Sequence, residues 1–213
     1  MAYTPIEKDT EVDHLSGEIR TIGIRDMRQD IQIINHSDRV EALLAPYKDA
    51  IGVDYDAYRA HIYRVLSFSM HFLKNDETYR PLVETALVYH DIGLWTDGDL
   101  AYLEPSEHLA LRDNQENNFG LDPDALVAAI HWHHKITAYK GQGADLVNAI
   151  RKADWVEVSQ GKLRKGLSKA QIKAVHDAIP DHGFPDTLQR LTGELGGSAI
   201  GGTTRLLRHV FKI

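Results

Sequence analysis

The sequence predicts an all-α protein that folds as a single domain, and three observations support this prediction. Apolar residues recur at helical spacing along most of the chain, and residues that commonly cap helices precede these apolar segments. No pair of alternating segments indicates a β-hairpin. The chain has 213 residues, of which 43% are hydrophobic, and this is enough to form one sizeable core.

The first three expected helices each begin at a residue that suits an N-cap. Asp54, Thr78 and Ser106 precede helical apolar patterns. Pro81 lies in the first turn of the second segment, and Gly120 follows the third, where a glycine commonly ends a helix. The three expected helices span residues 54–74, 78–91 and 106–119.

The later helices carry clearer start signals. Asp122 precedes Pro123, which is the arrangement of an N-cap followed by the first helical residue. Ser168 and Gln171 have the spacing of a capping box. These helices span residues 122–134, 144–160 and a segment from 168, followed by an expected turn at 180–186 and, over 196–211, a glycine-rich loop and a last helix.

Composition excludes several classes of protein and of site. The formal net charge of −7 argues against a broad nucleic-acid surface, although small anionic ligands remain compatible with it. The absence of cysteine excludes disulfides, thiolate zinc sites and iron–sulfur clusters. No apolar run approaches the roughly 18 residues that span a bilayer, and the N-terminal residues lack a signal-peptide pattern. We therefore expect a cytoplasmic protein with no membrane or nucleic-acid partner.

The segment "ALVYHDIGLW", residues 86–95, places two polar residues where an apolar helix should face the core. Val83, Ala86, Leu87 and His90 recur at i, i+3, i+4 and i+7, which is the spacing of a buried stripe. Asp91 lies on the flank of the same stripe. An imidazole and a carboxylate are therefore expected inside the protein, side by side.

Three other expected helices repeat this feature. His61 lies beside the apolar face of the first, His133 lies on the inward stripe of the fourth with His134 at its edge, and Asp154 shares a face with apolar residues of the fifth. His131 is less clearly inward.

A buried and unpaired carboxylate costs several kcal/mol. Asp91 and Asp154 therefore need cations, yet no lysine or arginine shares their stripes. A divalent metal held by these carboxylates and by neutral imidazoles would meet both needs. The sequence therefore predicts a metal site between four helices.

The same residues resemble a known family. In chain order, "HIYRV" at 61–65, "HDIG" at 90–93, "IHWHHK" at 130–135 and "RKADWVE" at 151–157 resemble the motifs of the HD superfamily, which is named for its adjacent His-Asp pair. The resemblance implies an all-helical bundle with a metal site in its core. It implies a helical HD domain over residues 36–213, with its metal-binding core at 55–160, after a partly irregular N-terminal extension at 1–35.

The resemblance also implies roles for individual residues. The core ligands of the family, which bind one metal, correspond to His61, His90, Asp91 and Asp154. Some members bind a second metal through two further histidines, which makes Asp91 a bridging ligand. His108 and His133 lie in the matching segment, and His134 is an additional candidate. The implied cofactor is a divalent transition metal, one or two per chain: iron, manganese or zinc.

The sequence departs from the family pattern directly after the His-Asp pair. Many members have a lysine after the glycine of H-D-x-G, whereas Leu94 and Trp95 stand here. Arg64, Lys135 or Arg151 could supply the positive charge that a substrate phosphate needs. The G-Y-P signature of the cyclic-dinucleotide phosphodiesterases is absent between residues 135 and 154, so that branch is not favoured.

The first functional hypothesis is a metal-dependent hydrolase that uses a metal-activated hydroxide on a small phosphate-containing molecule. Asp91, Arg64 and Lys135 are the residues expected to carry the catalysis. The alternative is a di-iron oxygenase of the HD type, which activates O₂ to cleave a C–C or C–P bond of a hydroxylated small molecule. A hydratase of the cyanamide hydratase type is a lesser alternative. The substrate is not identified by the sequence, and a homo-oligomer is compatible with it.

Overall fold

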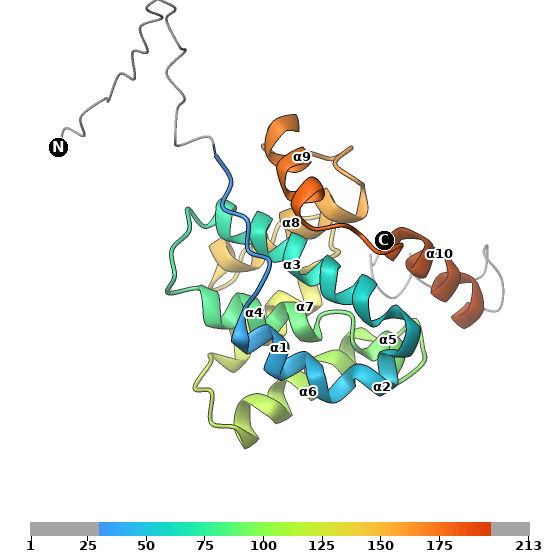
Figure 1. Ribbon diagram of the computed structural model, residues 1–213. Helices are drawn as coiled ribbons and strands as arrows, with labels where there is room; N and C mark the ends of the chain where they lie inside the picture. Colours follow the sequence, from blue (N-terminus) through green and yellow to red (C-terminus); the bar gives the residue numbers. More distant parts are fainter. Residues whose placement is uncertain (1–29, 197–213) are drawn as a thin grey trace, which may run out of the picture. The chain divides into compact units, whose positions relative to one another are not determined.

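The structure is a computed structural model that describes residues 30–196, and all regular secondary structure in that range is helical (Figure 1). This confirms the all-α class for the part of the chain described. Residues 1–29 of the expected N-terminal extension, and the expected glycine-rich loop and last helix beyond residue 196, lie outside it. The α-helices are α1 (Asp38–Leu44), α2 (Lys48–Ile51), α3 (Tyr55–Phe72), α4 (Arg80–Tyr89), α5 (Gly93–Thr96), α6 (Leu103–Glu116), α7 (Pro123–Trp132), α8 (Ala144–Val158), α9 (Lys169–Ala178) and α10 (Phe184–Leu195), and short 3₁₀ turns (Ala45–Tyr47 and Gly52–Asp54) flank α2.

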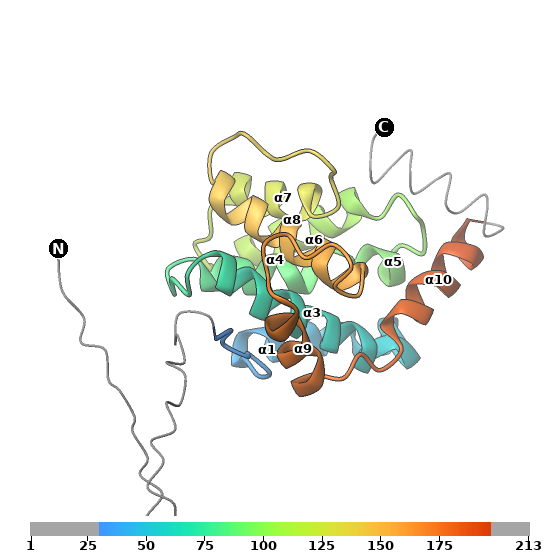
Figure 2. The ribbon, with the colours of Figure 1, turned by 90° about the horizontal axis from the view of Figure 1, so that it is seen from above.

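Four helices enclose a common interior. Helix α3 packs against α4 and α8, and α7 packs against the same two helices, so each of the four contacts two others (Figure 2). Helix α6 covers α7 and α4, while α1 covers α4. Any polar side chain directed into the space between α3, α4, α7 and α8 is therefore removed from water.

The apolar stripes expected from the sequence fill this interior. Val65, Leu87, Ile130 and Ile150, one from each of the four helices, are fully buried. Complete burial of such a side chain stabilises the fold by about 1.5–3 kcal/mol. The metal-ligand candidates occupy positions in these same stripes, so packing of the core sets their places.

Two helix starts agree with the sequence in detail. The Asp122 side chain accepts hydrogen bonds from the backbone N–H groups of Asp124 and Ala125, at 3.0 and 3.2 Å. Ser168 and Gln171 bond reciprocally through their side chains and backbone N–H groups, which completes the capping box of α9.

Three other expected caps have different roles, because tertiary partners use their oxygens. The Asp54 carboxylate binds Arg190 instead of capping α3. The Thr78 hydroxyl donates to Asp76, and α4 begins at residue 80. Ser106 lies inside α6, and its hydroxyl accepts the N–H of Gly93 at 3.0 Å.

Helix α10 was not expected from the sequence, which predicts a turn at 180–186. Gly183 adopts the left-handed backbone conformation (φ 83°) and turns the chain, and the helix begins at the next residue. Phe184 is buried, and Leu191 packs with Leu94 and Leu100. Both views show α10 beside α5, and it also packs against α3 (Figures 1 and 2).

Across residues 30–196, no helix combines the length and the apolar character that crossing a membrane would require.

Candidate metal centre

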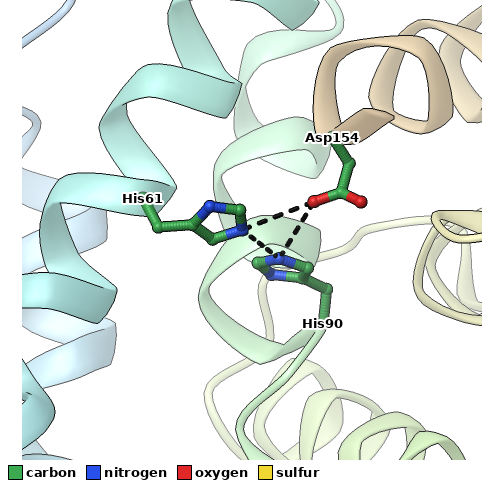
Figure 3. Close-up of side chains that lie close together, drawn as sticks. All are labelled: His61, His90 and Asp154. Carbon is green, nitrogen blue, oxygen red and sulfur yellow. Dashed lines mark hydrogen bonds and ion pairs between the residues drawn. The ribbon is translucent and has the colours of Figure 1, made fainter. Parts of the chain in front are cut away.

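The four enclosing helices bring five of the predicted ligands, and the additional candidate His134, to one place. Helix α3 contributes one residue, the end of α4 two, the end of α7 two and α8 one; Figure 3 shows three of them converging. The cluster, called the His/Asp cluster below, consists of His61, His90, Asp91, His133, His134 and Asp154.

The turn after α4 explains how a His-Asp pair can follow an apolar helix. His90 keeps a helical backbone conformation (φ −55°, ψ −34°), and the chain then turns into α5 at Gly93. A Cβ atom at Gly93 would lie 2.5 Å from the carbonyl oxygen of Tyr102, a distance that real side chains do not adopt. The close approach of this turn to the start of α6 therefore requires glycine, and it directs the preceding pair inward.

The donor atoms on the α3 and α8 side of the cluster lie at distances suited to one shared metal ion. His61 Nε2 lies 3.0 Å from His90 Nε2 and 3.4 Å from Asp154 Oδ1, and His90 Nε2 lies 3.2 Å from Asp91 Oδ2. A metal that binds each donor at about 2.0–2.2 Å places neighbouring donors about 3 Å apart. His61, His90 and Asp154 therefore form one group that could hold a metal ion, with Asp91 next to His90.

A second group of donors lies on the α7 side. Asp91 Oδ1 is 3.2 Å from His133 Nε2 and 3.7 Å from His134 Nε2, and His134 Nδ1 is 2.8 Å from Asp154 Oδ2. The two oxygens of Asp91 thus face different histidines, Oδ2 toward His90 and Oδ1 toward His133.

The ring orientations of His90 and His133 support metal binding. Nδ1 of each lies close to a carbonyl oxygen three residues earlier, that of Leu87 at 2.6 Å and that of Ile130 at 2.5 Å. A carbonyl oxygen only accepts, so Nδ1 carries the hydrogen in both rings, and Nε2 presents a lone pair whenever the ring is neutral. Such hydrogen bonds from the second ring nitrogen are typical of metal-binding histidines.

The electrostatics around His133 show why a cation fits there. Burial, together with the charge of His134, lowers the pKa of His133 to about 4, so its ring is neutral at pH 7. Burial alone would raise the pKa of Asp91, but His90, His133 and His134 outweigh it and hold the pKa well below its usual range. A lone pair of His133 thus faces a carboxylate oxygen 3.2 Å away, an arrangement that a cation between them would stabilise.

Two donor atoms of the His/Asp cluster, His133 Nε2 and Asp91 Oδ1, are buried without hydrogen bonds to residues 30–196. The Asp154 oxygens instead face histidines, Oδ1 toward His61 Nε2 at 3.4 Å and Oδ2 toward His134 Nδ1 at 2.8 Å. Buried polar atoms that make no hydrogen bond cost free energy, and a metal ion would use all of these as ligands. The residues present therefore fit a metal ion.

A proton on His134 also supplies positive charge beside the buried carboxylates of the cluster. Burial opposes the charge of His134, but Asp154 and Asp91 outweigh this and raise the pKa of His134 to about 10. An imidazolium at His134 and a metal ion answer the same need, which is positive charge beside two buried carboxylates. Metal binding at His134 therefore requires loss of its proton.

His108 does not join the cluster, contrary to the expected ligand set. Its side chain is exposed on α6, whereas the buried residues Ser106 and Ala110 mark the inward face of that helix. A residue two positions from each lies on the opposite side of the helix. His131 also points elsewhere, because its Nδ1 lies 2.7 Å from Glu107 Oε1. The additional candidate His134, and not His108, lies with His133 and Asp154 in the cluster.

The three candidate cations have different surroundings. The Arg64 guanidinium is buried and donates to Glu157 Oε1 and to the Ile179 carbonyl oxygen, both at 2.7 Å. Arg151 donates to the carbonyl oxygens of Lys135 and Ile136, at 3.3 Å each, and so holds the chain that follows His134. Lys135 is buried directly after His134.

Two aromatic neighbours of the cluster were not singled out by the sequence as site residues. The Tyr58 hydroxyl accepts the backbone N–H of Asp91 at 3.3 Å and donates to the Val88 carbonyl oxygen at 2.9 Å, which fixes the turn. Phe184 of α10 stacks on His61. An aromatic residue on an apolar stripe is indistinguishable in sequence from an ordinary core residue, so no signal marked either one.

Comparison with protein-family models, with curated proteins and with solved structures finds no match to this chain. What distinguishes the cluster is its own geometry: a buried set of imidazole and carboxylate donors from four helices, in which Asp91 and Asp154 each face histidines of both groups.

Proposed function

We propose that this protein is a metal-dependent hydrolase of the HD superfamily that acts on a small phosphate-containing molecule. The proposal is supported by the order of the His and Asp motifs along the chain and by the convergence of these residues between α3, α4, α7 and α8. A bound divalent metal lowers the pKa of water toward about 7 and so supplies hydroxide at neutral pH.

The observation that carries the proposal is the position of Asp91. Its carboxylate lies between His90 on one side and His133 on the other, at 3.2 Å from each. We infer that it bridges two metals, one held with His61, His90 and Asp154, the other with His133 and His134. Paired metals suit the displacement of a phosphate ester, because the attacking and the leaving oxygens both need positive charge.

The exposure of the ligands indicates the side from which a substrate approaches. The side chains of His61, His133 and Asp154 are fully buried, whereas that of His134 is 14% exposed. Lys135 is next to it in the chain. We propose that Lys135 neutralises substrate phosphate, because it directly follows this partly exposed ligand in the chain.

A di-iron oxygenase is the second candidate, and it is favoured because Arg64 and Arg151 already bind other groups of the protein. Arg64 and Arg151 are held by a carboxylate and by carbonyl oxygens, Leu94 is buried, and Trp95 donates its indole N–H to Asp54. Residues 94 and 95 thus offer no cation to a phosphate. A donor set of imidazoles and carboxylates without thiolate also suits iron that binds O₂.

An anaerobic assay of the manganese and iron forms separates the two candidates. A hydrolase should release inorganic phosphate from an aryl phosphate or a nucleotide without O₂, and manganese should support this reaction. Lys135→Met should then raise KM about tenfold or more, since a hydrogen bond to a charged group contributes about 1.5–3 kcal/mol. Absence of phosphate release from every ester, with O₂ uptake on a hydroxylated small molecule by the iron form, would overturn the hydrolase.

His133→Ala tests the number of metals. We expect the wild-type chain to bind two metals and the variant about one, because His61, His90, Asp91 and Asp154 keep their geometry. Metal content after gel filtration, measured by mass spectrometry at saturating Mn²⁺, gives the ratio.

His108→Ala and His131→Ala are the matched controls for this experiment. Both remove an imidazole that lies outside the His/Asp cluster, so both should keep the wild-type stoichiometry. A wild-type chain that holds a single metal at saturation would reject the bridging role of Asp91.

A further inference from the structure

His61 differs from the other buried histidines of the His/Asp cluster in how its ring is held. His90 and His133 each donate Nδ1–H to a carbonyl oxygen of their own helix. His61 Nδ1 is buried and has no hydrogen-bond partner among residues 30–196. The polar contacts of the His61 ring within the described residues are thus on Nε2, the nitrogen that faces the cluster, and no hydrogen bond holds the ring from its Nδ1 side.

A stacked aromatic ring lies against His61. The centroid of the Phe184 ring is 4.0 Å from that of the imidazole, and the two planes are inclined by 17°. The other rings near His61 are more distant, with centroids 5.1 Å away at His90 and 6.4 Å away at Tyr58. Phe184 is 1% exposed, so the contact excludes water from that face of the imidazole.

The Phe184 ring is held in place by the attachment of α10 to the start of α3. The Asp54 carboxylate accepts from Arg190 Nη2 at 2.6 and 2.7 Å and from the Thr187 hydroxyl at 3.2 Å. Trp95 donates its indole N–H to the same carboxylate at 3.0 Å. The first residue of α10 is thereby fixed over the metal-ligand candidate.

We propose that Phe184 is a positioning residue for His61. The flat contact holds the imidazole so that Nε2 points at His90 Nε2 and Asp154 Oδ1, 3.0 and 3.4 Å away. It does for His61 what the carbonyl hydrogen bonds do for the other two rings. Metal affinity thus depends on a helix that lies beyond all the metal-binding motifs in sequence. This inference rests on the metal centre and is independent of which reaction the centre supports.

Phe184→Leu tests the proposal, with Phe68→Leu as the matched control. Both changes replace a buried phenyl ring by an aliphatic side chain, but Phe68 lies edge-on to His176, with centroids 6.1 Å apart, away from the cluster. The measurement is the dissociation constant for Zn²⁺, by competition with a chromophoric chelator, alongside urea unfolding of the metal-free proteins. Phe184→Leu should weaken Zn²⁺ binding about tenfold, as loss of a partner of a metal-binding histidine does. Phe68→Leu should leave the dissociation constant unchanged, whatever it does to unfolding.

A double-mutant cycle separates positioning from a general structural effect. In a chain that carries His61→Asn, Phe184→Leu should cause no further loss of affinity, because the ring that it positions is gone. Wild-type affinity in Phe184→Leu, an equal loss in Phe68→Leu, or additive losses in the double variant would each overturn the proposal. A wild-type chain that binds Zn²⁺ but hydrolyses no phosphate ester would reject the proposed reaction and leave the role of Phe184 intact.

Discussion

Asp91→Ala is expected to abolish high-affinity metal binding, with a loss of at least about a hundredfold, while the helical content is retained. The two oxygens of Asp91 face different groups of histidines, Oδ2 toward His90 and Oδ1 toward His133, so its removal takes a ligand from each proposed metal. The loss of Asp91 should also remove the stabilisation of the folded protein by bound metal. Metal at a hundred times the dissociation constant stabilises a protein by about 2.7 kcal/mol, and the variant should show none of this increment.

Asp113→Asn is the control for this prediction. Asp113 is also a partly buried carboxylate, and it accepts hydrogen bonds from Tyr89, the residue before His90, and from Tyr47. Its substitution should lower stability but leave the metal-dependent increment intact. If Asp91→Ala were stabilised by metal as much as the wild-type chain, Asp91 would not be a ligand.

Glu157→Gln is expected to destabilise the metal-free protein by about 3–5 kcal/mol, because it leaves a buried guanidinium without its counter-charge. Glu157 accepts from Arg64 at 2.7 Å and lies 3.1 Å from His176 Nε2, and its side chain is 3% exposed. Glu77 faces Arg80 at 3.3 Å with its side chain 60% exposed, so Glu77→Gln should cost no more than about 1 kcal/mol. Chemical unfolding in EDTA measures both.

The pH dependence of this effect follows from the pKa of Glu157. Burial alone would raise the pKa, but His176, His61 and Arg64 outweigh it and lower it below the ordinary glutamate value. A lowered pKa means that the stabilisation is fully present above the unfolded-state value, about 4.3, and is lost as the pH falls through the folded-state value. The difference in the free energy of unfolding between the wild-type chain and Glu157→Gln should therefore be constant over the range of about pH 6 to 8, and it should shrink below about pH 4.5. A difference that grew on acidification would contradict the buried ion pair.

The sequence predicted those parts of the fold and site that local periodicity determines. The inward positions of His61, His90, His133 and Asp154 follow from the 3.6-residue repeat, because each shares a stripe with apolar residues that must be buried. The start of α7 was predicted from another local signal, the Asp122-Pro123 cap, and the structure confirms it. Helix periodicity and local capping geometry act over a few residues, so one sequence is enough to infer them.

Features that depend on distant partners were not predictable in this way. His108 was expected as a ligand from its place in the chain order, yet its exposure depends on which face of α6 packs inward. Arg64 was expected to serve a phosphate, but the residue that pairs with it, Glu157, is 93 positions away. Helix α10 was missed because Gly183, which precedes it in the left-handed conformation, is typical of a loop when only the sequence is known. The position of α10 also depends on the contact between Asp54 and Arg190, which are 136 positions apart.

Anomalous diffraction from crystals of the protein loaded with Mn²⁺ tests the metal centre most directly. We expect one peak about 2.0–2.3 Å from Nε2 of His61 and His90 and from carboxylate oxygens of Asp91 and Asp154, and a second peak between Asp91 Oδ1 and His133 Nε2. A cluster with no anomalous density, in which a protonated His134 forms ion pairs with Asp91 and Asp154, would contradict the proposed metal centre.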